Sequence, residues 1–352
     1  MHYIMCNRLH MKPVPQIRFE VIALATIRDV AKEAGVSVAT VSRHLNSKGY
    51  VSEEAKQSIE KAIATLQYAP NQLARSLSTK QTNMIGLLVP DITNPFFPEL
   101  ASAVERTAYE HGYTVMLCNA GETIDKEKHY IRTLQQNYAA GFIVTTNHIE
   151  ANFYQQLDVP IVALDRHLSE TIPTVTSDNV LGGKLAAQFL IDQGFKRILC
   201  VRGPLDIDVA NDRMKGFEAI MQTHTSVQYD TIVSPFDFAA AKEIAAAHFE
   251  TTRTYDAVFA CSDASAMGVM KAAESFGIAI PADLSVIGYD GINITTLLSP
   301  ELTTIAQPIT KMGERATQLL ITLIKGKQVE EQLVAFSPEL VIRNSTKKGM
   351  EA

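Results

Sequence analysis

The chain has 352 residues, 46% of them hydrophobic and 20% charged, and a net charge of −6. This length exceeds one compact core and predicts a small module plus a two-lobed domain. No run of 18 consecutive apolar residues occurs, which excludes a transmembrane helix. The four cysteines are scattered without C-x-x-C spacing, which argues against a zinc site or a disulfide framework and indicates a reducing compartment.

The charge is distributed unevenly along the chain. Residues 26–83 hold 8 Lys and Arg against 5 Asp and Glu, and residues 1–25 hold 3 against 1. The remainder holds 21 against 32, a net of −11. An acidic body with a basic N-terminal segment fits a protein in which one small module faces phosphate groups.

The first 24 residues show no helical or strand period, no capping signal and none of the ordered regions of a signal peptide. We therefore expect residues 1–25 to be an extension that lies outside the fold. Two explanations stay open: a disordered basic arm, or a start assigned too far upstream, with Leu24 as the true start at a non-AUG codon. The intact mass of the native protein would decide between them.

Residues 26–70 predict a small helical module. Thr26 is a good N-cap, apolar residues follow it at helical spacing, and Gly35 ends the first helix. Ser37 caps a second helix, Val38–Leu45, after a turn so short that the two helices must cross steeply. This is the helix-turn-helix arrangement, whose second helix enters the major groove of DNA.

The second helix has one face that meets the first helix and one that points away from it. Val41 and Leu45 lie on the inner face, whereas Ala39 and Arg43 lie on the outer face. Arg43 is therefore the best candidate for a bidentate contact to guanine, with a phosphate contact as the alternative. The predicted DNA-contacting residues of the module are Thr26, Ser37, Val38, Ala39, Thr40, Ser42, Arg43 and Asn46.

The module resembles the DNA-binding head of the LacI/GalR family. The matching motifs are Asp29-Val30-Ala31, Ala34-Gly35-Val36-Ser37, Thr40-Val41-Ser42-Arg43 and Tyr68-x-Pro70-Asn71. The resemblance implies that residues 71–83 are a hinge helix and linker, and that the hinge folds on operator DNA where two copies meet in the minor groove. Leu77 would wedge between base steps there, the alternative being an exposed linker leucine. The hinge residues implied to contact DNA are Asn71, Ala74, Arg75 and Leu77.

From Met84 onward, short apolar runs alternate with helical patterns. The predicted strands are Met84–Val89, Thr114–Leu117, Gly141–Thr145, Pro160–Leu164, Arg197–Val201, Ala257–Cys261 and Ser285–Tyr289. The predicted helices between them are Leu100–Glu110, Lys126–Gln135, Gly183–Gln193, Arg213–Gln222, Ala239–Phe249 and Ser265–Phe276. This alternation predicts an α/β core of parallel sheets with helices on both faces.

Ligands of such sheets bind at the carboxyl ends of the strands. Phe96 and Phe97 come after the first predicted strand, Asp165-Arg166 after the fourth, and Asp290 after the last, while Arg213 opens a later helix. Carboxylates and arginines give the paired contacts that sugar hydroxyls need, and aromatic rings cover a C–H face. Each group has a plainer explanation, a surface ion pair or ordinary core packing. Their convergence at strand exits is what predicts a sugar cleft.

Residues 84–345 resemble the type I periplasmic-binding-protein fold, a two-lobed, doubly wound parallel-sheet core that serves LacI/GalR proteins in ligand binding and dimerisation. The motifs that carry this resemblance include Asn94-Pro95-Phe96-Phe97, Arg213-x-x-Gly216-Phe217, Val286-Ile287-Gly288-Tyr289-Asp290 and Gln307-Pro308. The implied lobes are 84–178 with 307–336, and 179–305 with 338–345, followed by a tail at 346–352. Three crossings, near Asp178, Ala306 and Ser337, would join the lobes.

Within the family, the chain is most similar to ribose operon repressors. Ribose-binding proteins stack the sugar between phenylalanines and hold its hydroxyls with an Asp-Arg pair, a second Arg, an Asp and a Gln. The matching positions are Phe96, Phe97, Asp165, Arg166, Arg213, Asp290 and Gln307, and a further stacking ring is matched by Phe236 or Phe238. Ser262 stands where the family usually has Asn, which leaves the exact sugar open.

Other functions have less support in the sequence. No G-x-G-x-x-G follows the first strand, no nucleophile elbow or H-E-x-x-H occurs, and the nine histidines are dispersed, so we expect no enzyme, no cofactor and no metal site. A secreted solute-binding protein would not carry the head. The alternatives inside the family are a purine-responsive repressor and a catabolite-control regulator that uses a phosphoprotein corepressor.

The sequence therefore predicts a cytoplasmic, allosteric transcription repressor with no membrane partner. Its predicted partners are double-stranded operator DNA, a small sugar with ribose favoured, and a second copy of the chain, because two hinges must meet for Leu77 to wedge. The sequence leaves open whether ligand releases the DNA or promotes binding, although the resemblance to ribose repressors favours release.

Overall fold

The computed structural model describes residues 25–45, 49–68, 82–121, 123–146, 149–252 and 254–347. The chain forms two compact units, one ending at Thr79 and one beginning at Lys80. None of the helices in the described ranges is long and apolar enough to cross a membrane.

The first unit is a three-helix module, made of α1 (Ile27–Glu33), α2 (Val38–Leu45) and α3 (Glu53–Leu66). Val30, Val41 and Ile59, one from each helix, are completely buried and form its small core. The turn between α1 and α2 contains Gly35 at φ +67, a left-handed conformation that glycine adopts without strain. The predicted helix-turn-helix is confirmed, whereas residues 71–81 of the predicted hinge helix and linker lie outside the described residues.

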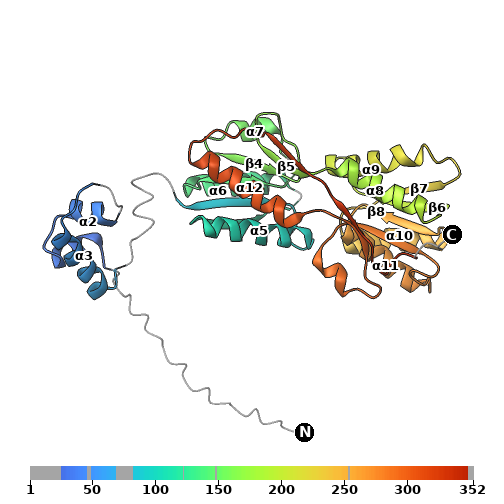
Figure 1. Ribbon diagram of the computed structural model, residues 1–352, viewed down its shortest axis with the longest axis horizontal. Coiled ribbons are helices and arrows are strands. Elements are labelled where there is room, and N and C mark those ends of the chain that lie inside the picture. Colours follow the sequence, from blue (N-terminus) through green and yellow to red (C-terminus); the bar gives the residue numbers. More distant parts are fainter. Residues whose placement is uncertain are drawn as a thin grey trace, which may run out of the picture. The chain divides into compact units, whose positions relative to one another are not determined.

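The second unit contains two six-stranded sheets in its described part (Figure 1). The first sheet has the order β11-β5-β4-β3-β1-β2, and all its pairs are parallel. Its strands are β1 (Met84–Val89), β2 (Thr114–Asn119), β3 (Gly141–Val144), β4 (Ile161–Leu164), β5 (Thr174–Ser177) and β11 (Leu333–Phe336). The accompanying helices are α5 (Phe96–Glu110), α6 (Ile124–Gln136), α7 (Ala151–Gln155) and α12 (Ile309–Ile324).

The second sheet repeats this order as β12-β10-β9-β8-β6-β7. Its pairs are parallel except for β12, which runs antiparallel to β10. Its strands are β6 (Arg197–Arg202), β7 (Gln228–Val233), β8 (Ala257–Ala260), β9 (Ser285–Asp290), β10 (Thr303–Ala306) and β12 (Glu339–Val341). The accompanying helices are α8 (Asn179–Asp192), α9 (Asp208–Met221), α10 (Phe238–Thr251), α11 (Asp263–Ser275) and the 3-10 helix η1 (Asn293–Leu297). This two-lobed α/β core confirms the predicted fold class.

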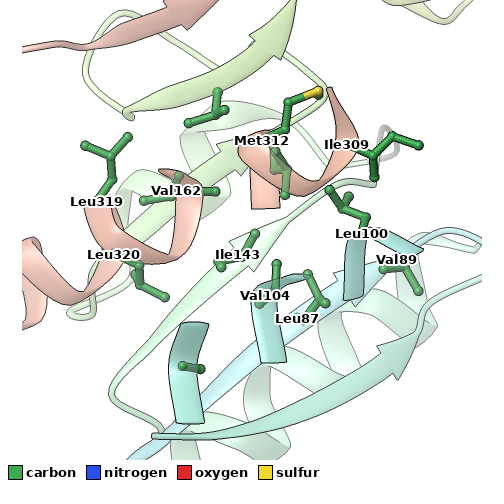
Figure 2. Packing of buried hydrophobic residues seen from close by; sticks show 14 of the residues in the cluster. Leu87, Val89, Leu100, Val104, Ile143, Val162, Ile309, Met312, Leu319 and Leu320 are labelled. Carbon is green, nitrogen blue, oxygen red and sulfur yellow. The ribbon is translucent and has the colours of Figure 1, made fainter. Parts of the chain in front are cut away.

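The chain passes between the sheets three times: after Ser177, after Ala306, and between Phe336 and Glu339. As a result, α12 belongs to the first lobe although its neighbour β10 belongs to the second (Figure 1). Figure 2 shows Met312, Leu319 and Leu320 of α12 gathered with Ile143 and Val162 of the sheet in one buried cluster.

Several elements differ from the sequence patterns. The patterns do not predict the strands β5, β7, β10, β11 and β12 or the helices α7, η1 and α12. β7 and β11 alternate exposed and half-buried residues, so they carry no continuous apolar run, and β5 and β10 are short and threonine-rich. Arg213, predicted to open a helix, lies in the second turn of α9, whose N-cap Ile207 offers no side-chain signal.

Candidate functional site

The outer face of α2 is the candidate DNA-contacting surface of the first unit. Val41 is buried against α1, whereas Ser37, Ala39 and Arg43 are exposed and Val38 is 42% exposed. The face geometry expected from the sequence is therefore present. Thr40 and Ser42, also predicted to contact DNA, are half-buried on its flanks.

One side-chain cap fixes the start of α1, and another fixes the start of α2. Thr26 and Asp29 form a capping box, in which the Asp29 carboxylate accepts from the Thr26 amide at 2.8 Å. The Ser37 hydroxyl accepts from the Thr40 amide at 3.1 Å. Thr26 and Ser37 are thus helix caps as well as predicted DNA-contacting residues. The remaining predicted DNA contacts lie outside the described residues, namely Asn46, Asn71, Ala74, Arg75 and Leu77.

The second unit contains a cavity of about 560 Å³ between the carboxyl ends of the two sheets. Its lining residues are Pro90, Asp91, Asn94, Phe96, Phe97, Thr145, Asp165, Pro204, Asp206, Ile207, Val209, Arg213, Pro235, Phe236, Asp237 and Asp290. Six of the residues predicted from the sequence are among them. At its rim the Asn94 amide donates to the Phe236 carbonyl at 3.1 Å, a contact between the lobes.

Arg213 is the centre of a buried polar network on the second lobe's side. It is 2% exposed, donates from Nε to Asn179 Oδ1 at 2.8 Å and from Nη1 to the Cys261 carbonyl at 2.6 Å. Its Nη1 also lies 3.2 Å from Asp290 Oδ1, which accepts from the Gln307 amide at 2.8 Å. Every group in this network is held in one orientation before any ligand arrives.

Aromatic rings complete the setting of Arg213. Its guanidinium carbon lies 3.9 Å from the Tyr289 ring centroid and 5.5 Å from that of Phe236. Phe236 fits because Gly203 has no side chain: a Cβ there would lie 2.3 Å from the ring. On the opposite wall, the rings of Phe96 and Phe97 pack edge to face, with their centroids 5.2 Å apart. The cavity thus has aromatic surface on both lobes.

Close packing of α8 on α9 sets the position of Arg213. A Cβ on Gly183 would lie 1.9 Å from the Arg213 carbonyl oxygen, and one on Gly216 would lie 2.0 Å from the Val180 carbonyl oxygen. The two helices therefore approach at backbone distance, which only glycine permits at these positions. This contact explains Gly183 and the Arg213-x-x-Gly216 motif, whereas a Cβ on the neighbouring Gly182 would instead lie 2.1 Å from the Tyr289 hydroxyl oxygen.

Asp165 and Asp290 end equivalent strands, β4 and β9, and both have positive φ, 57 and 121 respectively. Such backbone conformations are uncommon for a residue with a side chain, although Asp tolerates them better than most residues. Burial raises the pKa of Asp165 to about 7, the Arg213 charge opposing and Asp290 adding to the shift. Burial also raises the pKa of Asp290, again against the pull of Arg213. Arg213 and Gln307 partly compensate Asp290, whereas Asp165, whose Oδ1 has no partner, is costly to ionise unless a ligand hydroxyl compensates it.

Buried polar atoms without a hydrogen-bond partner cluster at this cavity. Six such side-chain atoms occur in the described part of the chain: Glu127 Oε2, Asp165 Oδ1, Arg166 Nε and Nη1, Tyr289 OH and Gln307 Oε1. Buried polar groups are normally paired, so a group of unpaired ones needs an explanation. Five of the six belong to Asp165, which lines the cavity, or to residues next to its lining.

Two predicted residues lie elsewhere. Ser262, 1% exposed, caps α11: its hydroxyl accepts from the Ser265 amide at 3.1 Å and donates to the Ser265 hydroxyl at 2.8 Å. Of the two alternatives left open, Phe236 lines the cavity, and Phe238 instead lines a separate apolar groove beside Met267 and Met270. Arg166 and Gln307 are buried next to lining residues, Asp165 and Asp290.

The sequence patterns missed part of the lining. Pro204, Asp206 and Ile207 come from the connection between β6 and α9, directly after a strand exit, and Val209 comes from the first turn of α9. The rule that found Asp165 would also have found this connection. The missing signal was the true start of α9, five residues before Arg213.

Comparison with known proteins assigns the chain to a protein family. Residues 26–71 match the model of bacterial regulatory proteins of the lacI family, and residues 187–346 match that of the periplasmic binding protein-like domain. The chain is 47% identical over 326 residues to the ribose operon repressor of Halalkalibacterium halodurans, covering 93% of this chain and 98% of that protein. The chain belongs to the lacI family. The resemblance read from its motifs is confirmed.

Solved lacI-family structures extend the match to the whole fold. A lac repressor dimer bound to operator and the anti-inducer ONPF has a TM-score of 0.81 at 25% identity, covering 92% of this chain and 99% of that one. A lacI-family regulator from Enterococcus faecium with bound ribose has a TM-score of 0.69 at 31% identity, covering 75% of this chain and 98% of that one.

Proposed function

We propose that this lacI-family chain is a sequence-specific transcriptional repressor whose operator affinity is controlled by a small sugar, ribose by preference. The head supplies the DNA-contacting surface and the cavity supplies the sugar site. Such a protein acts on cytoplasmic DNA and catalyses no reaction.

The observation that carries the sugar assignment is the cluster of unpaired buried polar atoms. A sugar hydroxyl donates one hydrogen bond and accepts others, so one small polyol can satisfy a carboxylate, a guanidinium and an amide together. Asp165, Arg166 and Gln307 offer these three chemistries, and Phe96, Phe97 and Phe236 offer rings for C–H faces. The Asp165-Arg166 pair favours a small polyol over a planar purine.

The charge of the lining points in the same direction. Five aspartates (Asp91, Asp165, Asp206, Asp237 and Asp290) face one arginine among the lining residues. An anionic ligand would meet net repulsion there, whereas a neutral polyol would not. The 47% identity to a ribose operon repressor and the fold shared with a ribose-bound regulator support ribose among such polyols.

Assembly into a homodimer is part of the proposal. An apolar groove on the second lobe is lined by Phe238, Met267, Met270 and Leu298, and the adjoining Leu297 is 82% exposed. Apolar surface of this kind marks a protein contact. A two-fold pair would also present two heads to the two halves of a palindromic operator.

Sugar binding controls the head through the lobes. The cavity takes groups from both, so a bound sugar favours the conformation in which the lobes close upon it. Only the difference in sugar affinity between the conformations can shift operator binding.

Calorimetry with a panel of pentoses, hexoses and purines tests the sugar assignment, and ribose is expected to bind most tightly. Tight purine binding without ribose binding would contradict it. For the DNA assignment, Leu77→Ala is expected to weaken specific operator binding much more than non-specific binding. Equal loss of the two would remove the proposed wedge.

A further inference from the structure

The connection that follows Asp290, at the end of β9, is fixed to the second lobe at its start. The backbone amides of Gly291 and Ile292 donate to Asp263 Oδ2 at 2.7 and 2.9 Å. Asp263 is completely buried in the first turn of α11, and its Oδ1 accepts from the Thr304 hydroxyl at 2.6 Å. The second lobe therefore sets the direction in which the connection leaves the sheet.

Two residues of this connection also make contacts with the first lobe. Ile292, although it follows a strand of the second lobe, is completely buried in the apolar cluster of the first lobe that includes Phe96 and Leu100. Asn293 is bound by Glu99: its backbone amide donates to Oε1 at 2.7 Å and its side-chain amide donates to Oε2 at 3.0 Å. Both oxygens of one first-lobe carboxylate thus bind one residue of the second lobe.

Glu99 lies in the first turn of α5, beside residues that line the cavity from the first lobe. Phe96 and Phe97 line it from the same turn, and Asn94, just before the helix, donates to the Phe236 carbonyl of the second lobe at 3.1 Å. The start of α5 is therefore bonded to the second lobe at two places, through Asn94 and through Glu99. Movement of this helix end away from the second lobe would break both contacts.

The contact takes Glu99 partly out of water. Glu99 is half-buried, and burial raises its pKa, whereas the hydrogen bond from the Asn293 amide opposes the shift. When the lobes separate, water replaces Asn293 as the donor to this carboxylate. The two hydrogen bonds therefore stabilise only the conformation in which the lobes are joined.

We propose that Glu99 is a positioning residue of the sugar site, a latch that holds the lobes together when sugar occupies the cavity. Glu99 binds the segment that begins at Asp290, and it thereby holds this carboxylate in register with the rings of Phe96 and Phe97. Glu99 is not one of the residues that line the cavity, so it acts on the sugar only through the closure of the lobes. The inference rests on the proposed sugar-binding function.

The first test is ribose affinity in the full-length protein. Glu99→Ala removes both acceptors and is expected to weaken ribose binding about tenfold by calorimetry. The matched control is Glu110→Ala, an exposed carboxylate at the other end of α5, which should change affinity less than about twofold. A lower Tm with unchanged affinity in Glu99→Ala would show a structural role only and overturn the latch. Absence of ribose binding in the unsubstituted protein contradicts the proposed function itself.

The second test asks whether Glu99 acts through Asn293. Asn293→Ala removes the side-chain donor but keeps the backbone donor, and it should weaken ribose binding about threefold. In a Glu99→Ala background the same substitution should have no further effect, because the bond that it removes is already absent. Equal effects in the two backgrounds overturn the proposal.

Hydrogen exchange, measured by NMR, tests whether the latch depends on sugar. The Gly291 and Ile292 amides, bonded to Asp263 within the second lobe, should be protected with and without ribose. The amide of the exposed Asn293, bonded across the lobes, should gain about tenfold protection with ribose. This measurement needs only the unsubstituted protein, so it holds even if Glu99→Ala does not fold. Equal protection of Asn293 with and without ribose would make the contact permanent and overturn the latch.

Discussion

The two lobes share one strand order but prepare their halves of the cavity differently. In the second lobe, Asp290 is bound by Arg213 and Gln307, so its carboxylate is fixed and partly neutralised. In the first lobe, Asp165 stands at the equivalent strand end with an unpaired, shielded Oδ1. One half of the site is thus preorganised by the protein, and the other half depends on the ligand for its partners. A sugar would therefore complete the first lobe and join it to the second.

The largest expected effect comes from breaking the preorganised half. Arg213→Met leaves Asp290 and Asn179 buried without their partner. We expect the free energy of unfolding to fall by about 3–5 kcal/mol, as when one member of a buried ion pair is removed. Ribose affinity should fall by more than about a hundredfold, or 2.7 kcal/mol. Denaturant unfolding and calorimetry measure the two quantities.

The control for Arg213 is Arg202→Met, in the same lobe. Arg202 is half-buried, bonds to Asn211 and does not line the cavity. Its loss should leave ribose affinity within about twofold. Similar losses of affinity in both variants would mean that Arg213 acts through general lobe stability.

Asp165, in the first lobe, should behave differently from Arg213, because its substitution should reduce sugar affinity without reducing stability. Asp165→Asn should weaken ribose binding about thirtyfold, or 2 kcal/mol, without lowering the free energy of unfolding at pH 8, because an unpaired buried carboxylate is costly to the sugar-free fold. Glu170→Gln, an exposed carboxylate beyond the same strand, is the control. A large loss of stability in Asp165→Asn would show that its carboxylate already has a partner.

The pKa of Asp165 gives the third expectation. Because burial raises this pKa from 3.8 to about 7, its contribution to stability is present below about pH 4 and is lost as pH rises through 7. If the sugar pairs with the ionised carboxylate, ribose affinity should rise about fivefold to tenfold from pH 6 to pH 8. Calorimetry in buffers of different ionisation enthalpy would detect the proton released near pH 7. A flat profile, equal to that of Asp165→Asn, would remove Asp165 from the contact set.

Phe236 and Phe238, the two alternatives for the further stacking ring, give the next expectation. Phe236→Leu removes a ring that lines the cavity and lies over Arg213, and ribose affinity should fall about tenfold, or 1.4 kcal/mol. Phe238→Leu should leave affinity within about twofold, because that side chain lines the separate groove. The reverse order would assign sugar stacking to Phe238.

The smallest expected effect is at Ser262. Ser262→Ala removes the N-cap of α11 and should cost about 1 kcal/mol of stability. Ribose affinity should change less than about twofold, since the hydroxyl is occupied by Ser265. A loss of affinity larger than the loss of stability would place Ser262 in the sugar contact set.

The sequence was most informative where physical rules are local. Alternating patterns predicted the parallel sheets, and the strand-exit rule selected Asp165 and Asp290. The same rule cannot tell a helix cap from a ligand contact, and Ser262 shows the ambiguity because both need an oxygen after a strand. It also gave no access to the buried Glu127, whose hydrogen-bond partners Thr146 and Tyr154 are distant in sequence.

The strand order also limits what periodicity can predict. Edge strands such as β7 and β11 carry exposed residues, and β12 pairs antiparallel with β10 at the end of the chain. These strands form because they pair with strands far away in the sequence, not because their own residues favour a strand. Periodicity likewise did not single out α12, and only the family resemblance placed residues 307–336 in the first lobe.

Those three crossings have a consequence for synthesis of the protein on the ribosome. The head and the first five strands of lobe one emerge early, but α12 and β11, which complete that lobe, come from the last 44 residues of the 352. Until then, Ile143 and Val162 lack the helix that covers them in Figure 2. A prematurely terminated chain would thus expose apolar sheet surface, which favours aggregation and recognition by chaperones or proteases. The cell would thereby discard fragments that carry a DNA-binding head without sugar control.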